Sequence, residues 1–141
     1  MRTILFILII LLNTKSFAAS NNFFSEGLTL YQQKKLDKAK FKFEQDIVLN
    51  PKNEKSYLYL SKIFKELNKN ELEEKNLNTV ILLNPKNEEA NYLLMEIELK
   101  KSNYSKVREL AENFTKICNK LCDKKDSILK SLKNLEPKNE S

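Results

Sequence analysis

The heptamer Ile47-Val48-Leu49-Asn50-Pro51-Lys52-Asn53 recurs as Ile81-Leu82-Leu83-Asn84-Pro85-Lys86-Asn87, 34 residues further along the chain, with six of the seven positions identical. Each copy follows a stretch whose apolar residues recur at helical spacing, and its proline, which has no N–H to donate, helps to end that helix. Two unrelated helix-ending turns are the alternative interpretation. Repetition of a whole heptamer at this period favours stacked helical hairpins instead.

The period divides the chain into three units, residues 20–53, 54–87 and 88–121, and leaves residues 122–141 as a remainder. Each unit contains two stretches with apolar residues at helical spacing, and the remainder contains one, from about Asp123 to Leu135. A terminal hairpin has no neighbour to bury its apolar side. We therefore expect the final helix to cover the open face of the third unit.

Three asparagines stand where predicted helices begin. Asn53, Asn70 and Asn87 are each followed by Glu. An asparagine before a helix accepts a hydrogen bond from the first turn, and a glutamate there interacts favourably with the helix dipole. These three residues are therefore predicted N-caps.

The composition favours an all-α protein without enzymatic chemistry. The 141 residues include one Gly and three Pro, too few turn residues for a β-sandwich or a dinucleotide-binding sheet. Histidine is absent, which removes the usual general base at neutral pH and the commonest metal ligand. A glycine-rich phosphate loop is also missing. We expect no catalytic residue, no metal, no cofactor and no small-molecule substrate.

The net charge is +6, but the basic residues are spread along the chain. The three units and the remainder contain six, six, six and five basic residues against four, five, six and four acidic ones. Proteins that bind nucleic acid gather their basic residues on one face. This even distribution argues against a nucleic-acid partner.

The first twenty residues differ in composition from the rest. Arg2 precedes nine apolar residues from Ile4 to Leu12, and small residues at Ser16 and Ala18 follow a polar stretch. This order is that of a secretory signal peptide over residues 1–18, cleaved before Ala19. A retained membrane anchor is the alternative, although nine residues rise only about 14 Å as a helix, roughly half the hydrocarbon thickness. We expect export to the bacterial periplasm or the exterior.

The two cysteines, Cys118 and Cys122, lie four positions apart. One interpretation treats them as small apolar residues on a helix face, and the other pairs them in a disulfide, which export favours. A bond would close the turn between the third unit and the final helix. The spacing matches neither a thioredoxin-like motif nor haem attachment, and zinc would lack two ligands.

The repeat resembles the tetratricopeptide repeat family, whose 34-residue units are helix-turn-helix hairpins. The first unit matches the family pattern at Phe23, Gly27, Ala39, Phe43 and Pro51. The second unit keeps Tyr57, Leu60, Phe64, Leu77 and Pro85, but has Ser61 and Glu73 at the two positions where small residues are usual. The third departs further, with Met95, Val107, Ala111 and Asn119 at pattern positions. The resemblance implies an all-α solenoid of about three hairpins with a C-terminal capping helix.

The resemblance also implies that the first helix of each hairpin lines a concave groove for a partner protein. The implied groove residues are apolar in the first unit and include lysines in the second: Phe24, Leu28, Tyr31, Lys55, Leu58, Lys62, Lys65, Tyr92, Glu96 and Leu99. The chaperone-binding branch of the family captures a C-terminal carboxylate with Lys, Asn and Arg side chains. The matching positions here are Phe24, Leu28, Tyr59, Glu89 and Leu93, so that clamp is absent.

The sequence therefore predicts an exported protein-interaction module that holds a segment of an envelope partner protein in its groove. An apolar wall beside lysines favours a segment with an apolar anchor next to an acidic residue. The alternative is a self-associating scaffold of the envelope, whose final helix or open first hairpin docks on another copy. In that case the protein is a homo-oligomer.

Overall fold

The computed structural model describes residues 22–135, and within this range the chain is all-α, as the sequence predicts. The seven helices of this range are α2 (Phe23–Gln32), α3 (Leu36–Leu49), α4 (Glu54–Glu66), α5 (Asn70–Leu83), α6 (Glu88–Lys100), α7 (Tyr104–Ile117) and α8 (Cys122–Leu135). The expected signal peptide, residues 1–18, lies outside the described residues. Among the helices that are described, none has the length and apolar character needed to cross a membrane.

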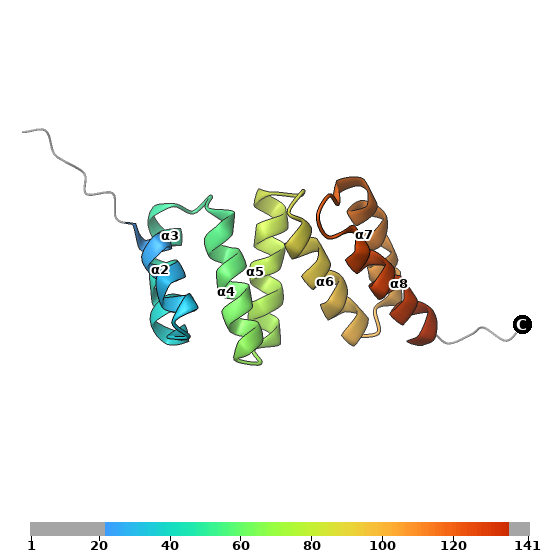
Figure 1. Cartoon of the computed structure of the whole chain (residues 1–141), viewed down its shortest axis with the longest axis horizontal. Coiled ribbons are helices and arrows are strands. Elements are labelled where there is room, and N and C mark those ends of the chain that lie inside the picture. The colour runs from blue at the N-terminus through green and yellow to red at the C-terminus, as the bar shows by residue number, and fades with distance from the viewer. Residues whose placement is uncertain (1–21, 136–141) are drawn as a thin grey trace, which may run out of the picture.

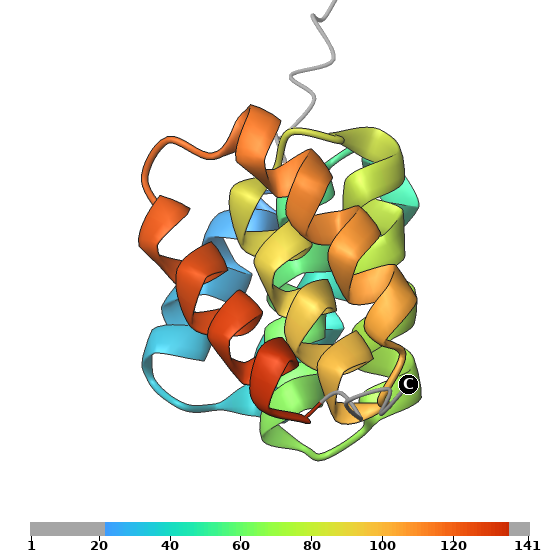
Figure 2. The same ribbon diagram turned by 90° about the vertical axis from the view of Figure 1, so that its right-hand side faces the viewer.

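The helices form three antiparallel hairpins and a final helix, arranged in a row (Figure 1). Helix α2 pairs with α3, α4 with α5, and α6 with α7, and each hairpin packs on the next. Helix α8 packs on α6 and α7 at the C-terminal end of the row. Viewed along the row, the even-numbered helices lie on one side and α3, α5 and α7 on the other (Figure 2). One broad face is thus built from the first helix of every hairpin.

The turns between hairpins contain the repeated heptamer, and asparagine caps follow it. Asn53 accepts a hydrogen bond from the backbone N–H of Lys55, and Asn87 accepts one from that of Ala90. Both residues are therefore N-caps, as predicted. Asn70 is not: it is the first residue of α5, and the residue before it makes no side-chain capping bond.

The turns inside the hairpins have a different geometry, and α5 begins one residue earlier than the predicted cap requires. Lys34, Asn68 and Ser102 occupy equivalent positions and have left-handed backbone, with φ of 59°, 55° and 59°. The next residue in each turn donates its N–H to the preceding helix, as Lys69 does to the Phe64 carbonyl at 2.8 Å. This arrangement is the Schellman motif. These bonds satisfy carbonyls at the end of the preceding helix, and the helix that follows begins without a side-chain cap.

The apolar interior consists of two clusters that meet in α4. The first contains Ala39, Phe43, Leu60, Ile63 and Phe64 and joins the first hairpin to α4. The second extends from Leu58 through the third hairpin to Ile128 and Leu132 of α8. Helix α8 therefore buries the open side of the third hairpin, in the position expected for a capping helix.

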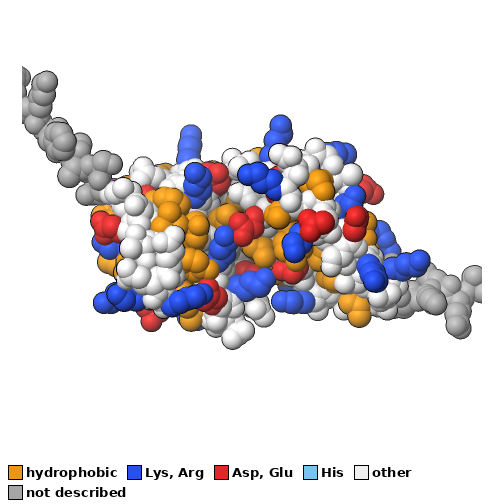
Figure 3. All heavy atoms as spheres, viewed as in Figure 1, with side chains coloured by type: hydrophobic (Ala, Val, Ile, Leu, Met, Phe, Trp, Pro, Cys, Tyr) orange, Lys and Arg blue, Asp and Glu red, His pale blue; other side chains and the backbone are white. Residues whose placement is uncertain are grey.

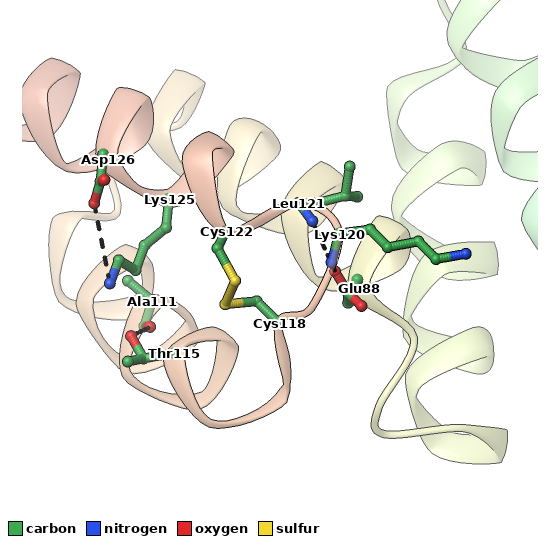
Figure 4. Close-up of a disulfide and its surroundings, with 9 residues drawn as sticks. All are labelled: Glu88, Ala111, Thr115, Cys118, Lys120, Leu121, Cys122, Lys125 and Asp126. Atoms are coloured by element: carbon green, nitrogen blue, oxygen red, sulfur yellow. Dashed lines mark hydrogen bonds and ion pairs between the residues drawn. A yellow bond between two sulfur atoms is a disulfide. The ribbon is translucent and has the colours of Figure 1, made fainter.

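The turn between α7 and α8 is closed by a covalent bond and by a carboxylate. Cys118 and Cys122 form a disulfide across a Cα–Cα distance of 5.2 Å. Glu88, at the start of α6, accepts hydrogen bonds from the backbone N–H groups of Lys120 and Leu121, each at 2.9 Å (Figure 4). Hydrogen bonds from this turn, with Asn119 first and Leu121 next, hold the pKa of Glu88 below its usual value. The turn is thereby fixed against the third hairpin.

Candidate groove on the face of α2, α4 and α6

The face formed by the first helices carries apolar side chains at one end and mixed charges along its middle (Figure 3). Helical spacing explains this arrangement, because residues three or four apart share a face. Phe24, Leu28 and Tyr31 lie in this register on α2, and all three are partly buried. Tyr92, Glu96 and Leu99 lie in the same register on α6 and are also partly buried.

An aromatic patch forms where α2 meets α4, and we define it as Phe24, Tyr31 and Tyr59. Tyr59 lies edge-on to both other rings, with centroid distances of 6.0 Å to Phe24 and 5.4 Å to Tyr31. Beneath the patch, the ring of Phe43 stacks on Tyr59 at 5.2 Å. Such pairs contribute about 0.5–1.5 kcal/mol beyond the burial of area. The patch is consequently a firm apolar surface that remains partly open to solvent.

A series of ion pairs joins successive first helices across the face. Lys34, just beyond α2, pairs with Glu66 at 3.4 Å. From α4 to α6, Lys62 pairs with Glu89 at 2.8 Å and Lys65 pairs with Glu96 at 2.9 Å. These pairs are partly exposed, and each contributes at most about 1 kcal/mol. Their main effect is to offset the positive charge of the groove.

Two tyrosine hydroxyls extend this network. Tyr31 donates a hydrogen bond to Glu66 at 2.8 Å, and Tyr92 donates one to Glu96 at 2.6 Å. Burial and the Glu66 carboxylate raise the pKa of Tyr31 to about 12, and the bond to Glu96 with burial raises the pKa of Tyr92 to about 12. Both phenols are therefore neutral hydrogen-bond donors at physiological pH.

Glu96 on this face and the buried Glu73 on α5 have opposite electrostatic environments. Burial opposes ionisation of Glu96, but hydrogen bonds from Tyr92 and Lys65 outweigh it and lower the pKa of Glu96. Glu73 on α5 is only 4% exposed, and this burial raises the pKa of its carboxyl against the attraction of Lys65 and Lys100. Glu73, which stands where the repeat family usually has a small residue, is therefore poorly solvated.

The structure corrects two features of the groove that the sequence predicts. Leu58 is 8% exposed and packs in the second cluster, so its side chain belongs to the interior. Lys62 and Lys65 are engaged with glutamates, and Lys62 also lies 4.8 Å from the centre of the Tyr59 ring. Lys55 alone of the three predicted lysines is exposed without an ion pair among the described residues.

Tyr59 lies on this face but is not among the groove residues that the sequence predicts, although the sequence contains a signal for it. Lys55, Tyr59, Lys62 and Glu66 follow one another at helical spacing, so one face of α4 carries them all. The predicted set included Leu58, which lies one position away on the adjacent, buried face. The pairing of Glu66 with Tyr31 and of Glu89 with Lys62 was not predicted, because no local pattern shows which helices will be neighbours.

A hollow lies between α5, α6 and α7 and has a volume of about 440 Å³. Its floor includes the buried Asn91, which donates to the carbonyls of Pro85 and Asn87 and accepts a hydrogen bond from Asn113. Asn91 thus has partners for both polar ends of its amide. The hydrogen bonds of Asn91 in this hollow are therefore structural, whereas the face of α2, α4 and α6 presents the aromatic patch.

Comparison with solved structures places this fold among tetratricopeptide repeat (TPR) domains. The chain matches the first TPR of Spaghetti (RPAP3) bound to the HSP90 peptide SRMEEVD with a TM-score of 0.69 and 15% identity, covering 80% of this chain and 90% of that one. It matches the Yersinia enterocolitica type III secretion chaperone SycD in complex with a peptide of the translocator YopD with a TM-score of 0.73 and 19% identity, covering 86% and 98%.

A third solved structure, the Sgt2 TPR domain from Aspergillus fumigatus, matches with a TM-score of 0.66 and 17% identity, covering 88% of each chain. Neither the protein-family models nor the curated proteins yielded a match. The shared property is therefore the fold.

Proposed function

We propose that this chain, which has the fold of TPR domains, is a protein-interaction module that holds a peptide segment of a partner protein on the face of α2, α4 and α6. The aromatic patch of Phe24, Tyr31 and Tyr59 is the observation that carries this proposal. Two TPR structures of the same fold contain bound peptides, one from HSP90 and one from YopD. These likenesses support a peptide ligand. Which peptide sequence binds would depend on the residues of this groove.

The groove chemistry favours an apolar anchor as the main feature of the ligand. Partly exposed aromatic rings offer large contact area with little loss of side-chain freedom. The lysines at 62 and 65 are already offset by Glu89 and Glu96. An acidic residue in the ligand would compete with these glutamates for the lysines. Its contribution to the binding affinity is therefore smaller than the sequence alone implies. We propose an extended or helical segment with one or two large apolar side chains.

We further propose that the module works outside the cytoplasm, in the periplasm or the exterior. The order of charged, apolar and small residues in 1–18 supports export. The disulfide between Cys118 and Cys122 suits an oxidising compartment. The function is non-catalytic in this proposal, because the chain contains no histidine and the groove offers no nucleophile with an adjacent base.

A peptide selection followed by calorimetry tests the groove. Residues 19–141, which contain every described helix, are used to select ligands from a random peptide library, and the affinity of a selected peptide is measured. We expect Tyr31→Ala to weaken binding more than Lys62→Ala, because an aromatic anchor contributes a few kcal/mol and an exposed charge about 1 kcal/mol or less. Only the share contributed by Lys62 should fall with added salt.

Tyr31→Phe is the matched control, since it removes only the hydroxyl that donates to Glu66. It should retain most of the affinity. If Tyr31→Ala and Lys62→Ala both fold normally and bind the selected peptide with the affinity of the unaltered protein, the face of α2, α4 and α6 is not the binding surface.

Self-association is the second candidate, and one surface favours it. Phe41 on α3 is 57% exposed and borders a hollow of about 400 Å³ with Leu30, Asp37, Lys38 and Lys42, on the free side of the first hairpin. Light scattering during size-exclusion chromatography separates the two functions. A monomer at all concentrations excludes the scaffold, whereas a dimer that Phe41→Ser dissociates would establish it.

A further inference from the structure

Helix α3 carries an exposed, mostly apolar stripe on its outer side. Phe41, Gln45 and Val48 are four and three residues apart, so they share one face of the helix. Phe41 is 57% exposed and Val48 is 79% exposed, and Gln45 between them is partly buried. We call these three residues the α3 stripe. The buried residues of α3 lie on its other side, so the stripe points away from the interior.

The other hairpins lack a stripe of this kind. At the two apolar positions of the stripe, α5 has Lys75 and Leu82, and α7 has Glu109 and Lys116. Only α3 is apolar at both. The position of Phe41 is exposed in all three hairpins and is charged in the other two. An aromatic ring at such a position favours a surface that contacts another molecule.

Gln45, in the middle of the α3 stripe, has an unsatisfied amide. Within residues 22–135, its Oε1 is the buried side-chain polar atom that lacks a hydrogen-bond partner. Such an atom destabilises the isolated molecule, because it has lost water without gaining a donor. A glutamine amide both donates and accepts, so it can pair with an identical amide. Where two copies meet at this residue, rotation of the side chains would give each Oε1 a donor.

Helix α3 is electrically neutral, although the whole chain has a net charge of +6. It contains three lysines and three acidic residues. The two lysines beside Phe41 already have partners, since Lys40 pairs with Glu44 at 2.8 Å and Lys42 pairs with Glu26 at 2.6 Å. A neutral surface has no attraction for a strongly acidic or basic partner. It is also the surface on which two copies of a positively charged protein meet with least repulsion.

We propose that the α3 stripe is the contact surface of a twofold homodimer. Both copies present the same patch in such a contact, so the patch must be complementary to itself. The stripe meets this condition, because it has apolar side chains at both ends and a self-pairing amide between them. The hollow of about 400 Å³ beside Phe41 gives space for an apolar side chain of the second copy. This dimer rests on the second candidate function, self-association, and gives it a surface and a symmetry.

Dimerisation through α3 leaves the peptide groove open. The α3 stripe and the face of α2, α4 and α6 belong to opposite sides of the row (Figure 2). Each dimer would therefore carry two peptide sites. A partner with two copies of the bound segment would be held more tightly than a partner with one copy.

Sedimentation equilibrium of residues 19–141 over a range of concentrations tests the dimer. We expect a reversible equilibrium between monomer and dimer with no larger species. Phe41→Lys introduces the residue that α5 has at this position. It should raise the dissociation constant of the dimer at least about a hundredfold, because two aromatic rings lose their burial. A monomer up to the solubility limit would overturn the proposal, and so would open-ended assembly, which a twofold contact does not allow.

Two matched pairs of variants test whether α3 makes the contact. Val48→Ser and Leu82→Ser remove side chains that are 79% and 81% exposed at equivalent positions of α3 and α5. Val48→Ser should raise the dissociation constant about tenfold, and Leu82→Ser should leave it unchanged. A short bismaleimide should cross-link Gln45→Cys to a dimer but not the equivalent Thr79→Cys. The native cysteines do not react, because they are bonded to each other. Equal behaviour within either pair would overturn the proposal.

Calorimetry with the selected peptide separates the dimer from the groove. Phe41→Lys and Val48→Ser should bind the peptide with the affinity of the unaltered protein, and Tyr31→Ala should lose affinity while remaining a dimer. A monomer that binds the peptide would contradict the dimer alone. A dimer that binds no peptide would contradict the groove alone. Circular dichroism confirms that each variant retains its fold.

Discussion

The β-carbon that Gly27 lacks would lie 2.7 Å from Cε1 of Phe43. Gly27 is buried on α2, and the Phe43 ring that faces it is fully buried and stacks on Tyr59. The only glycine of the chain is therefore explained by the close approach of α3, and not by a turn. This contact also supports the aromatic patch from below.

Replacement of Gly27 by alanine should lower the free energy of unfolding by about 1–3 kcal/mol. The added methyl group would displace Phe43, and this cost exceeds the roughly 0.5–1 kcal/mol that alanine contributes to an exposed helix. Denaturant unfolding measures the change. Thr29→Ala on the exposed side of α2 is the control and should be near neutral. A Gly27→Ala protein as stable as the original would show that the two helices can separate slightly at no cost.

Ser102→Gly should raise the free energy of unfolding by up to about 1 kcal/mol, because a residue with a β-carbon is disfavoured in left-handed backbone. Asn68→Gly should change stability less, since asparagine tolerates this conformation. Ser105→Gly, inside the following helix, should instead destabilise the protein by about 1 kcal/mol. The three midpoints of urea unfolding give the comparison, and the reverse order would contradict the assigned turn geometry.

Glu73 and Glu96 should affect stability with opposite dependence on pH. The pKa of Glu73 is raised in the folded protein, so its favourable contribution is present at acid pH and is lost as pH rises through that pKa. Glu73→Gln should therefore stabilise the protein at pH 7, with a gain that disappears in acid. The pKa of Glu96 is lowered, so Glu96→Gln should destabilise the protein at pH 7 and lose that effect in acid. Urea unfolding between pH 3 and 8 tests both signs.

Reduction of the bond between Cys118 and Cys122 should lower stability by about 2 kcal/mol or less, because so short a loop restricts the unfolded chain only slightly. The double variant Cys118→Ser with Cys122→Ser should show the same loss and should not respond to reductant. The exported protein should contain no titratable thiol under native conditions. Two reactive thiols in that material would refute the bond.

The exported protein should begin at Ala19, as Ser16 and Ala18 suit the positions that precede signal-peptide cleavage. Mass spectrometry of the protein recovered from the cell envelope measures the N-terminus. Ala18→Arg should block processing and leave the leader attached. Recovery of unaltered protein with Met1 in the membrane fraction would support the retained anchor instead.

Local sequence patterns predicted the helices because helix formation and capping depend on residues that are close together in the sequence. The heptamer contains the proline and the asparagine cap of one turn, so Asn53 and Asn87 could be assigned from the sequence alone. Asn70 also precedes a glutamate, but it is itself the first residue of α5, and Lys69 before it makes no side-chain capping bond. The residue type therefore predicts a helix start only where its side chain makes the capping hydrogen bond.

The candidate groove was harder to predict because its properties arise between helices. The aromatic residues of α2 were recognised, but their contact with Tyr59 depends on the angle between two hairpins. The lysines of α4 were expected to be available to a ligand, and the glutamates of α6 offset them.

Leu58 and Leu60 lie two positions apart on α4, yet they pack in different apolar clusters. We therefore expect two cooperative folding units that share one helix, the smaller at the N-terminus and the larger closed by α8 and the disulfide. Opening of the smaller unit would separate Phe24 and Tyr31 from Tyr59 and leave Glu96 in place. A peptide that spans both units binds only when the smaller one is closed. Its binding energy would then add to the stability of the N-terminal half, so occupancy of the groove would raise the folded fraction of that half.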